Sequence, residues 1–167
     1  VSSDQNIRSL QFSAMDWGDY DDDGDMDLAI SGQNRSGEAQ SLIYENSPSG
    51  LAIKSDANVE ALQNGDVAWG DADNDGDLDL VVLGQDSFEN RGGALYLSGS
   101  AVGDFDFSLG LDLQDLSSSS VDWGDVDNDG DLDLAVMGQS DDIVDGRLQS
   151  YTRILINGAG GFSDGSF

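Results

Sequence analysis

The sequence contains neither cysteine nor histidine. Without cysteine the chain forms no disulfide bonds and offers no thiolate to a metal ion. Without histidine it lacks the commonest zinc ligand and the usual general base near pH 7. Any metal site must therefore be built from carboxylate and carbonyl oxygens, which prefer hard cations.

Basic residues are also scarce. Six lysines and arginines stand against 34 acidic residues, and the formal net charge is −28. Such a chain repels nucleic acid and anionic lipid surfaces at moderate ionic strength. No run approaches the roughly 18 apolar residues of a membrane-spanning helix. We therefore expect no nucleic-acid partner and no membrane insertion. The chain begins at Val1 without a signal-like segment or an initiating Met, which predicts a processed or excised piece.

The acidic residues are gathered rather than spread. Nearly half of them fall in three windows, residues 19–27, 71–79 and 125–133. Such clusters oppose compaction unless a cation neutralises them. The length of 167 residues and the hydrophobic content of 38% suit one globular domain. We therefore expect a single domain with three cation sites.

Each acidic window opens a sequence repeat. The tripeptide Trp-Gly-Asp begins at Trp17, Trp69 and Trp123, about every 53 residues. Each window leads into a short apolar run that ends in Gly-Gln, and further apolar runs and turns follow without helical periodicity. Four short strands per repeat predict an all-β fold of three four-stranded antiparallel β-propeller blades. A β-sandwich would fit the strand content but not the repeat.

The repeat boundaries follow from this pattern. Residues 1–167 form a single propeller segment, with repeats at approximately 12–63, 64–118 and 119–167. We expect residues 1–11 to be the outer strand of a preceding blade and residues 162–167 to lead into a following one. The stretches 85–93, 117–120 and 139–150 are predicted loops. Three blades do not complete a typical ring, so the segment is expected to belong to a longer propeller or to a homo-oligomer.

The spacing of the acids within each window suits calcium. Calcium takes six to eight oxygen ligands, which a tight loop supplies when alternate residues point inward and a glycine allows a sharp turn. Asp19, Asp21 and Asp23 have this spacing and precede Gly24, Asp25 offers its backbone carbonyl, and Asp27 closes the site. The candidate ligands for three Ca²⁺ ions are Asp19, Asp21, Asp23, Asp25 and Asp27; Asp71, Asp73, Asp75, Asp77 and Asp79; and Asp125, Asp127, Asp129, Asp131 and Asp133, with Asp25, Asp77 and Asp131 acting through the carbonyl.

An EF-hand begins in the same way but ends differently. It requires a glutamate at loop position 12 and helices on both sides. Position 12 here is Ile30, Val82 or Val136, and the flanking residues resemble strands. Instead, the pattern Trp-Gly-Asp-x-Asp-x-Asp-Gly-Asp-x-Asp-Leu resembles the FG-GAP or VCBS-type repeat of integrin α-subunit propellers and secreted bacterial proteins. That resemblance implies four-stranded blades, calcium between the first two strands of each, and an extracellular, secreted or cell-surface location.

Other recurring residues have structural interpretations. The three tryptophans are expected to pack between blades, because they recur at one position of every repeat. Arg35, Arg91 and Arg147 follow the second strand of each repeat and favour local ion pairs over a binding rim. Gln33, Gln85 and Gln139 are expected to form turn or inter-blade hydrogen bonds. Paired acids could serve a glycosidase, but metal coordination already explains them, so we expect no enzyme and no catalytic residues.

Three functions remain open at this point. The first is an extracellular binding or adhesion module, in which calcium stabilises the blades and loops contact a glycan or a surface protein. The second is a structural segment of a larger surface protein or filament. The third is an accessory propeller of a secreted polysaccharide-degrading enzyme. The sequence does not identify the ligand.

Overall fold

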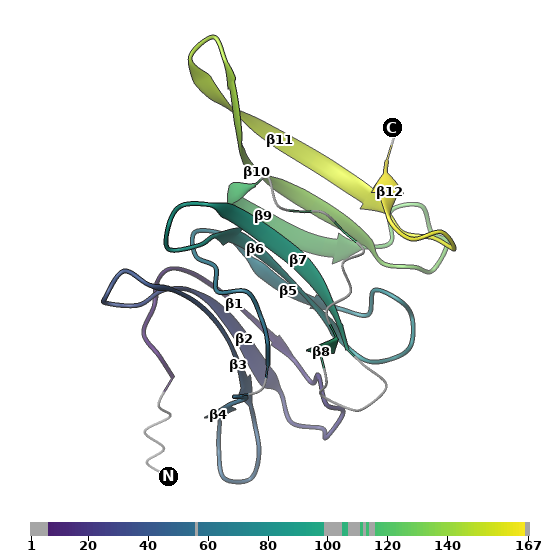
Figure 1. Cartoon of the computed structure of the whole chain (residues 1–167). Coiled ribbons are helices and arrows are strands. Elements are labelled where there is room, and N and C mark those ends of the chain that lie inside the picture. Colours follow the sequence, from purple (N-terminus) through teal and green to yellow (C-terminus); the bar gives the residue numbers. More distant parts are fainter. Residues whose placement is uncertain are drawn as a thin grey trace.

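The computed structural model describes residues 7–55, 57–98, 105–106, 111, 113 and 116–165. Its regular structure consists of three four-stranded antiparallel sheets, one for each repeat (Figure 1). The first contains β1 (Gln11–Gly18), β2 (Asp27–Gln33), β3 (Ala39–Glu45) and β4 (Ala52–Ile53). The second contains β5 (Val67–Gly70), β6 (Asp79–Gln85), β7 (Arg91–Ser98) and β8 (Phe105–Asp106). The third contains β9 (Ser117–Gly124), β10 (Asp133–Val144), β11 (Arg147–Ile156) and β12 (Ser163–Asp164).

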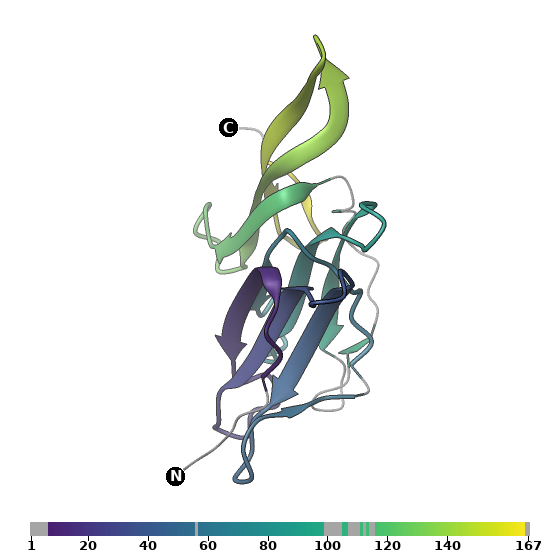
Figure 2. The ribbon, with the colours of Figure 1, turned by 90° about the vertical axis from the view of Figure 1, so that its left-hand side faces the viewer.

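Within each sheet the strands lie in chain order, so each sheet is a meander. This confirms the prediction of an all-β chain with three four-stranded antiparallel units. The described residues do not close into a ring (Figures 1 and 2). The sheets lie face to face with the second between the other two, and the closest strand contacts between sheets are made by β1, β2, β5, β6 and β9.

Burial differs between the sheets because of this order. In β6, Leu80, Val81, Val82 and Leu83 are all buried, so both faces of the second sheet are covered. Val81 and Leu83 pack with Leu134 of the third sheet, whereas Leu80 and Val82 pack with Ile43 of the first. In β10, by contrast, Leu134 and Val136 are buried while Ala135 and Met137 are exposed. The third sheet is therefore covered on one face only.

Tryptophan and glycine form the joint between successive sheets. A Cβ placed on Gly18 would lie 2.9 Å from Cγ of Trp69, and one on Gly70 would lie 2.6 Å from Nε1 of Trp123. Each indole thus rests directly on a glycine of the preceding sheet, which needs that residue to lack a side chain. The prediction that tryptophans pack between the repeats is confirmed for Trp69 and Trp123. Trp17 differs, because its side chain is 49% exposed.

These contacts give a matched pair of substitutions. We expect Gly70→Ala to lower the free energy of unfolding by about 1–3 kcal/mol, because the new methyl group overpacks the indole of Trp123. Gly124 occupies the same position in the third sheet, where an added Cβ meets no atom within 4 Å. Gly124→Ala should therefore change stability by less than about 0.5 kcal/mol. Urea unfolding of both variants checks this, and equal losses would contradict the Trp–Gly joint.

Four loop and boundary predictions have different outcomes. Residues 117–120 and most of 139–150 are strand rather than loop, since β9 begins at Ser117 and β10 and β11 are joined by the tight turn at Asp145 and Gly146. The loop predicted at 85–93 is shorter, spanning residues 86–90. Ser163–Asp164 pair with β11 and do not lead out of the sheet, so that prediction is wrong for these residues. Residues 166–167 lie outside the described part of the chain.

The predicted strand at residues 1–11 is described only in part. Residues 1–6 lie outside the described residues, residues 7–10 belong to no strand, and Gln11 is the first residue of β1. Leu10 packs against Leu28, Ile30 and Tyr44 on the outer face of the first sheet. This face is therefore partly covered by the chain that precedes β1.

Candidate metal centre

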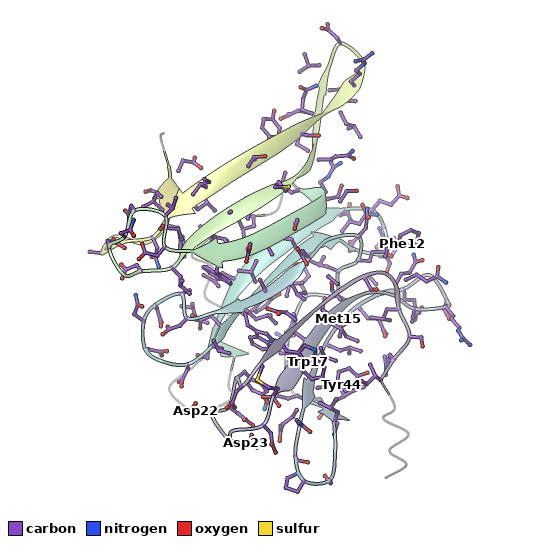
Figure 3. All side chains as sticks on the ribbon, turned by 180° about the vertical axis from the view of Figure 1, so that it is seen from behind. Phe12, Met15, Trp17, Asp22, Asp23 and Tyr44 are labelled. Carbon is purple, nitrogen blue, oxygen red and sulfur yellow. The ribbon has the colours of Figure 1, made fainter. Side chains whose placement is uncertain are left out.

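Each acidic loop connects the first and second strands of its sheet, as the sequence predicts. The loops turn through two successive regions of left-handed backbone. Asp22, Asn74 and Asn128 have φ values of 59°, 59° and 62°, and the glycines two residues later, Gly24, Gly76 and Gly130, have 91°, 98° and 100°. Aspartate, asparagine and glycine are the residues that tolerate this conformation. The sequence therefore favours the same tight loop in all three repeats. Figure 3 shows Asp22 and Asp23 in the first of these loops, which follows β1.

The loops bring three carboxylates together in each sheet. Any two members of a triad present carboxylate oxygens within 4.8 Å of one another. The triads are Asp19, Asp21 and Asp27; Asp71, Asp73 and Asp79; and Asp125, Asp127 and Asp133. They are the first, third and ninth residues of each window. Such a group of oxygens could hold a metal ion.

The other predicted ligands lie in the same loops with different contacts. Oδ1 of Asp23 accepts the N–H of Asp25 at 2.8 Å, and the equivalent bonds from Asp77 to Asp75 and from Asp131 to Asp129 both measure 3.0 Å. These hydrogen bonds stabilise the turn. The fifth residue of each window, such as Asp23, is not a member of the triad. Metal coordination by its carboxylate, or by the backbone carbonyl of the seventh residue, such as Asp25, stays a prediction.

The ninth residue of each window is buried and fixed by two backbone N–H groups. Asp79, which is 0% exposed, accepts the N–H of Ala72 at 2.7 Å with Oδ2 and that of Ser98 at 2.8 Å with Oδ1. Asp27 accepts from Tyr20 and Asn46 in the same way, and Asp133 from Val126 and Asn157. Each of these aspartates therefore ties the start of the acidic loop to the end of the third strand.

The first residue of each window accepts the backbone N–H of the loop glycine. Oδ2 of Asp19 accepts the N–H of Gly24 at 3.1 Å, and Oδ2 of Asp71 accepts that of Gly76 at 3.2 Å. Their other oxygens, Oδ1 of Asp19 and Oδ1 of Asp71, are buried without a hydrogen-bond partner among the described residues. A buried carboxylate oxygen without a partner is costly. A cation between the triad oxygens would remove that cost.

The pKa values of the buried aspartates also favour a bound cation. Burial raises the pKa of Asp27 to about 6, although the N–H groups of Asn46 and Tyr20 oppose the shift, and the charges of Asp21 and Asp23 add to it. Burial likewise raises the pKa of Asp79 to about 6, again against two backbone N–H groups and with a contribution from neighbouring aspartates. A raised carboxyl pKa means that the charged form is disfavoured. The protein therefore keeps these carboxylates together at neutral pH at a cost that a bound cation would offset.

The three loops differ in how well they are covered. Tyr20 follows the first ligand of the first loop, is buried, and stacks on Trp69 with ring centroids 5.7 Å apart. Val126 has the same position in the third loop and is 44% exposed. The second and third loops are joined by the Asn74 side chain, whose Nδ2 donates to Oδ1 of Asp131 at 2.8 Å. The third site is thus the most open to solvent.

Two of the other recurring residues make contacts outside the acidic loops. Arg91 donates from Nε to Oγ of Ser117 at 3.0 Å and so links the second and third sheets, and Nε2 of Gln33 donates to the Gly37 carbonyl in a turn. Both contacts are structural. Among the described residues no helix is long and apolar enough to cross a membrane.

Comparison with models of protein families found no match for the chain, and a search of curated proteins found none either. The chemistry of the site must therefore be argued from the triads themselves. What they establish is an all-β protein of repeated sheets with three aspartate clusters that could hold metal ions.

Proposed function

We propose that this chain is a calcium-binding β-propeller segment, in which each acidic loop holds one Ca²⁺ and the ions stabilise the blades. The observation that carries the proposal is the pair of buried oxygens, Oδ1 of Asp19 and Oδ1 of Asp71, which lie in aspartate triads without a hydrogen-bond partner among the described residues. Carboxylate oxygens in an adaptable loop suit calcium, which accepts six to eight ligands. Magnesium demands octahedral geometry and usually retains several waters.

The propeller part of the proposal has its own support. The sheets are four-stranded meanders that stack face to face, and their first strands, β1, β5 and β9, lie in succession. Propeller blades are four-stranded meanders that follow one another around an axis, so this arrangement supports the proposal. Together with the resemblance of the loops to FG-GAP or VCBS-type repeats, it favours a part of a larger or oligomeric propeller rather than three separate sheets.

We further propose an extracellular, secreted or cell-surface location and a role in adhesion or in recognition of a glycan or protein. Calcium modules that work outside the cell bind with a Kd on the order of 10⁻⁴ to 10⁻³ M, because calcium is plentiful there. A cavity of about 530 Å³ lies between the second and third loops and is lined in part by Asp73, Asn74, Asp131 and Phe162. Polar groups beside an aromatic ring are suited to a sugar. No catalytic role is proposed.

Titration calorimetry tests the calcium sites directly. We expect Ca²⁺ to bind the chain at three sites with a Kd on the order of 10⁻⁴ to 10⁻³ M, and Mg²⁺ to bind more weakly. The variant Asp71→Asn keeps the size of the side chain but removes one charge of the second triad. It should lose binding at one site of the three.

A matched control is Asp66→Asn, which removes the same charge outside the triads, where Oδ2 of Asp66 accepts from Ser120 and Val121. It should retain three sites. Equal effects of Ca²⁺ and Mg²⁺, or equal losses in the two variants, would show general attraction of cations to an acidic chain and not three calcium loops.

A further inference from the structure

The joint between neighbouring sheets is made of several contacts that recur at equivalent positions. Besides the indole of Trp69 over Gly18 and that of Trp123 over Gly70, a backbone hydrogen bond is repeated. The N–H of Asn64 donates to the Phe12 carbonyl at 2.9 Å, and the N–H of Ser118 donates to the Asn64 carbonyl at 2.8 Å. All three residues have left-handed backbone, with φ values of 47°, 54° and 47°. Each sheet therefore has an incoming face, with tryptophan, and an outgoing face, with glycine.

The incoming face of the first sheet has the groups of this joint without a sheet against them. Met15 is 63% exposed, whereas Val67 at the equivalent position of the second sheet is buried. Trp17 is 49% exposed, whereas Trp69 is 8% exposed. Figure 3 shows Phe12, Met15 and Trp17 in succession along β1. The first sheet therefore presents to solvent the tryptophan that is buried in the second sheet and partly buried in the third.

The outgoing face of the third sheet has a hollow at the matching place. This cavity, of about 330 Å³, is lined by residues that include Gly124, Val126, Ala135 and Ile154. The equivalent residues of the first sheet are Gly18, Tyr20, Ala29 and Ile43, all of which are buried against the second sheet. Asp122, also on the edge of the hollow, stands where Asp16 accepts the N–H of Trp69 at 2.9 Å. The hollow is therefore formed by the same positions of the third sheet that, in the first sheet, lie against the second sheet and its Trp69.

We propose that copies of this chain associate head to tail, with the indole of Trp17 from one copy in the hollow over Gly124 of the next. In this joint the N–H of Phe12 donates to the Ser118 carbonyl, which continues the backbone hydrogen bonds between the sheets. The contact is heterologous, because two different surfaces of the chain meet, and it can be repeated from copy to copy. The occupant is a second copy because the chain itself presents both halves of a joint that it already makes twice.

Charge opposes this association and determines the conditions of the test. Each copy carries a formal net charge of −28, so copies repel one another at low ionic strength. The hollow is lined mainly by apolar groups, although Asp122, Asp125 and Asp133 also line it. Salt at about 0.5 M shortens the range of the repulsion without weakening apolar contacts. Because Asp125 and Asp133 belong to the third triad, the measurements are made in such salt both with and without calcium. Trp17 is not a candidate metal ligand, so its substitution separates this proposal from the calcium sites.

The experiment uses two variants that each block one half of the joint. Trp17→Ala removes the inserted side chain, and Gly124→Leu fills the hollow. Light scattering should show the unaltered protein at twice the mass of one copy or more, and each variant alone as a monomer. An equimolar mixture should form a dimer and nothing larger, because the first variant retains the hollow and the second retains the tryptophan.

Phe88→Ala is the matched control, because Phe88 is 85% exposed on the loop between β6 and β7 and takes no part in the joint. It should associate like the unaltered protein. Circular dichroism melts of each variant confirm folding, which neither blocked position should disturb. A monomeric unaltered protein, an associating Trp17→Ala variant, or a mixture that remains monomeric would each overturn the proposal.

Discussion

Removal of calcium is expected to lower the free energy of unfolding by about 4 kcal/mol. The figure follows from mass action. When free calcium is at ten times the Kd of a site, its binding stabilises the folded chain by about 1.4 kcal/mol, and the chain has three triads. For a domain of this size the loss corresponds to a fall in Tm of about 8–16 °C. The physical reason is the repulsion within each triad, which the cation relieves. Thermal melts in millimolar calcium and after chelation measure it.

The control for this prediction is the triple variant Asp19→Asn, Asp71→Asn and Asp125→Asn. Each substitution removes the charge of the first ligand in one loop. The variant should melt at nearly the same temperature with and without calcium, because the sites that respond to the ion are gone. Magnesium at the same concentration should raise the Tm of the unaltered protein less than calcium does. An equal response of the variant to calcium would place the ion elsewhere.

The second large effect is expected at Asp79. We expect Asp79→Ala to destabilise the protein by about 3 kcal/mol more than Asp73→Ala, with both measured by urea unfolding in saturating calcium. Each substitution removes one carboxylate of the second triad, so the loss of a metal ligand is common to both. Only Asp79→Ala also leaves the N–H groups of Ala72 and Ser98 without their acceptor inside the protein.

Asp79→Asn should fall between the two, because its side-chain oxygen can still accept one of the N–H groups. Asp79→Ala and Asp79→Asn both remove the charge of this metal ligand, so the difference between them reports the hydrogen bonds from Ala72 and Ser98. If Asp79→Ala and Asp73→Ala unfold with the same free energy, the ninth residue of the window acts through the metal alone. The same reasoning applies to Asp27, which accepts from Tyr20 and Asn46.

Much of this architecture could be predicted from the sequence, because the same motifs occur in all three repeats. The acidic windows locate the turns between the first and second strands, and the recurring Trp-Gly pair locates the contact between the sheets. The choice of aspartate or asparagine at Asp22, Asn74 and Asn128 is explained by the left-handed backbone there. The sequence alone shows only that these positions vary.

Other features depend on contacts that the sequence does not display. The donors to the ninth residue, Asn46, Ser98 and Asn157, act through backbone N–H groups, so no common residue type reveals them. Ser117–Ser120 form a strand because the chain pairs there with β10 and with the Asn64 carbonyl, although serine favours turns in isolation. The turn at Asp145 and Gly146 carries the Asp-Gly signature of a two-residue hairpin within a stretch whose polar composition suggests a longer loop.

The position of the second sheet has a consequence for how the molecule comes apart. Its strand β6 is covered on both faces, whereas β10 and β11 expose one face to solvent. In stacked units of this kind the total stability is a sum of the units and their nearest-neighbour contacts. Local opening therefore starts at the outer sheets and reaches β6 last. A further sheet packed against either outer sheet would suppress this local opening. The lifetime of the folded stack therefore grows with the number of sheets in it.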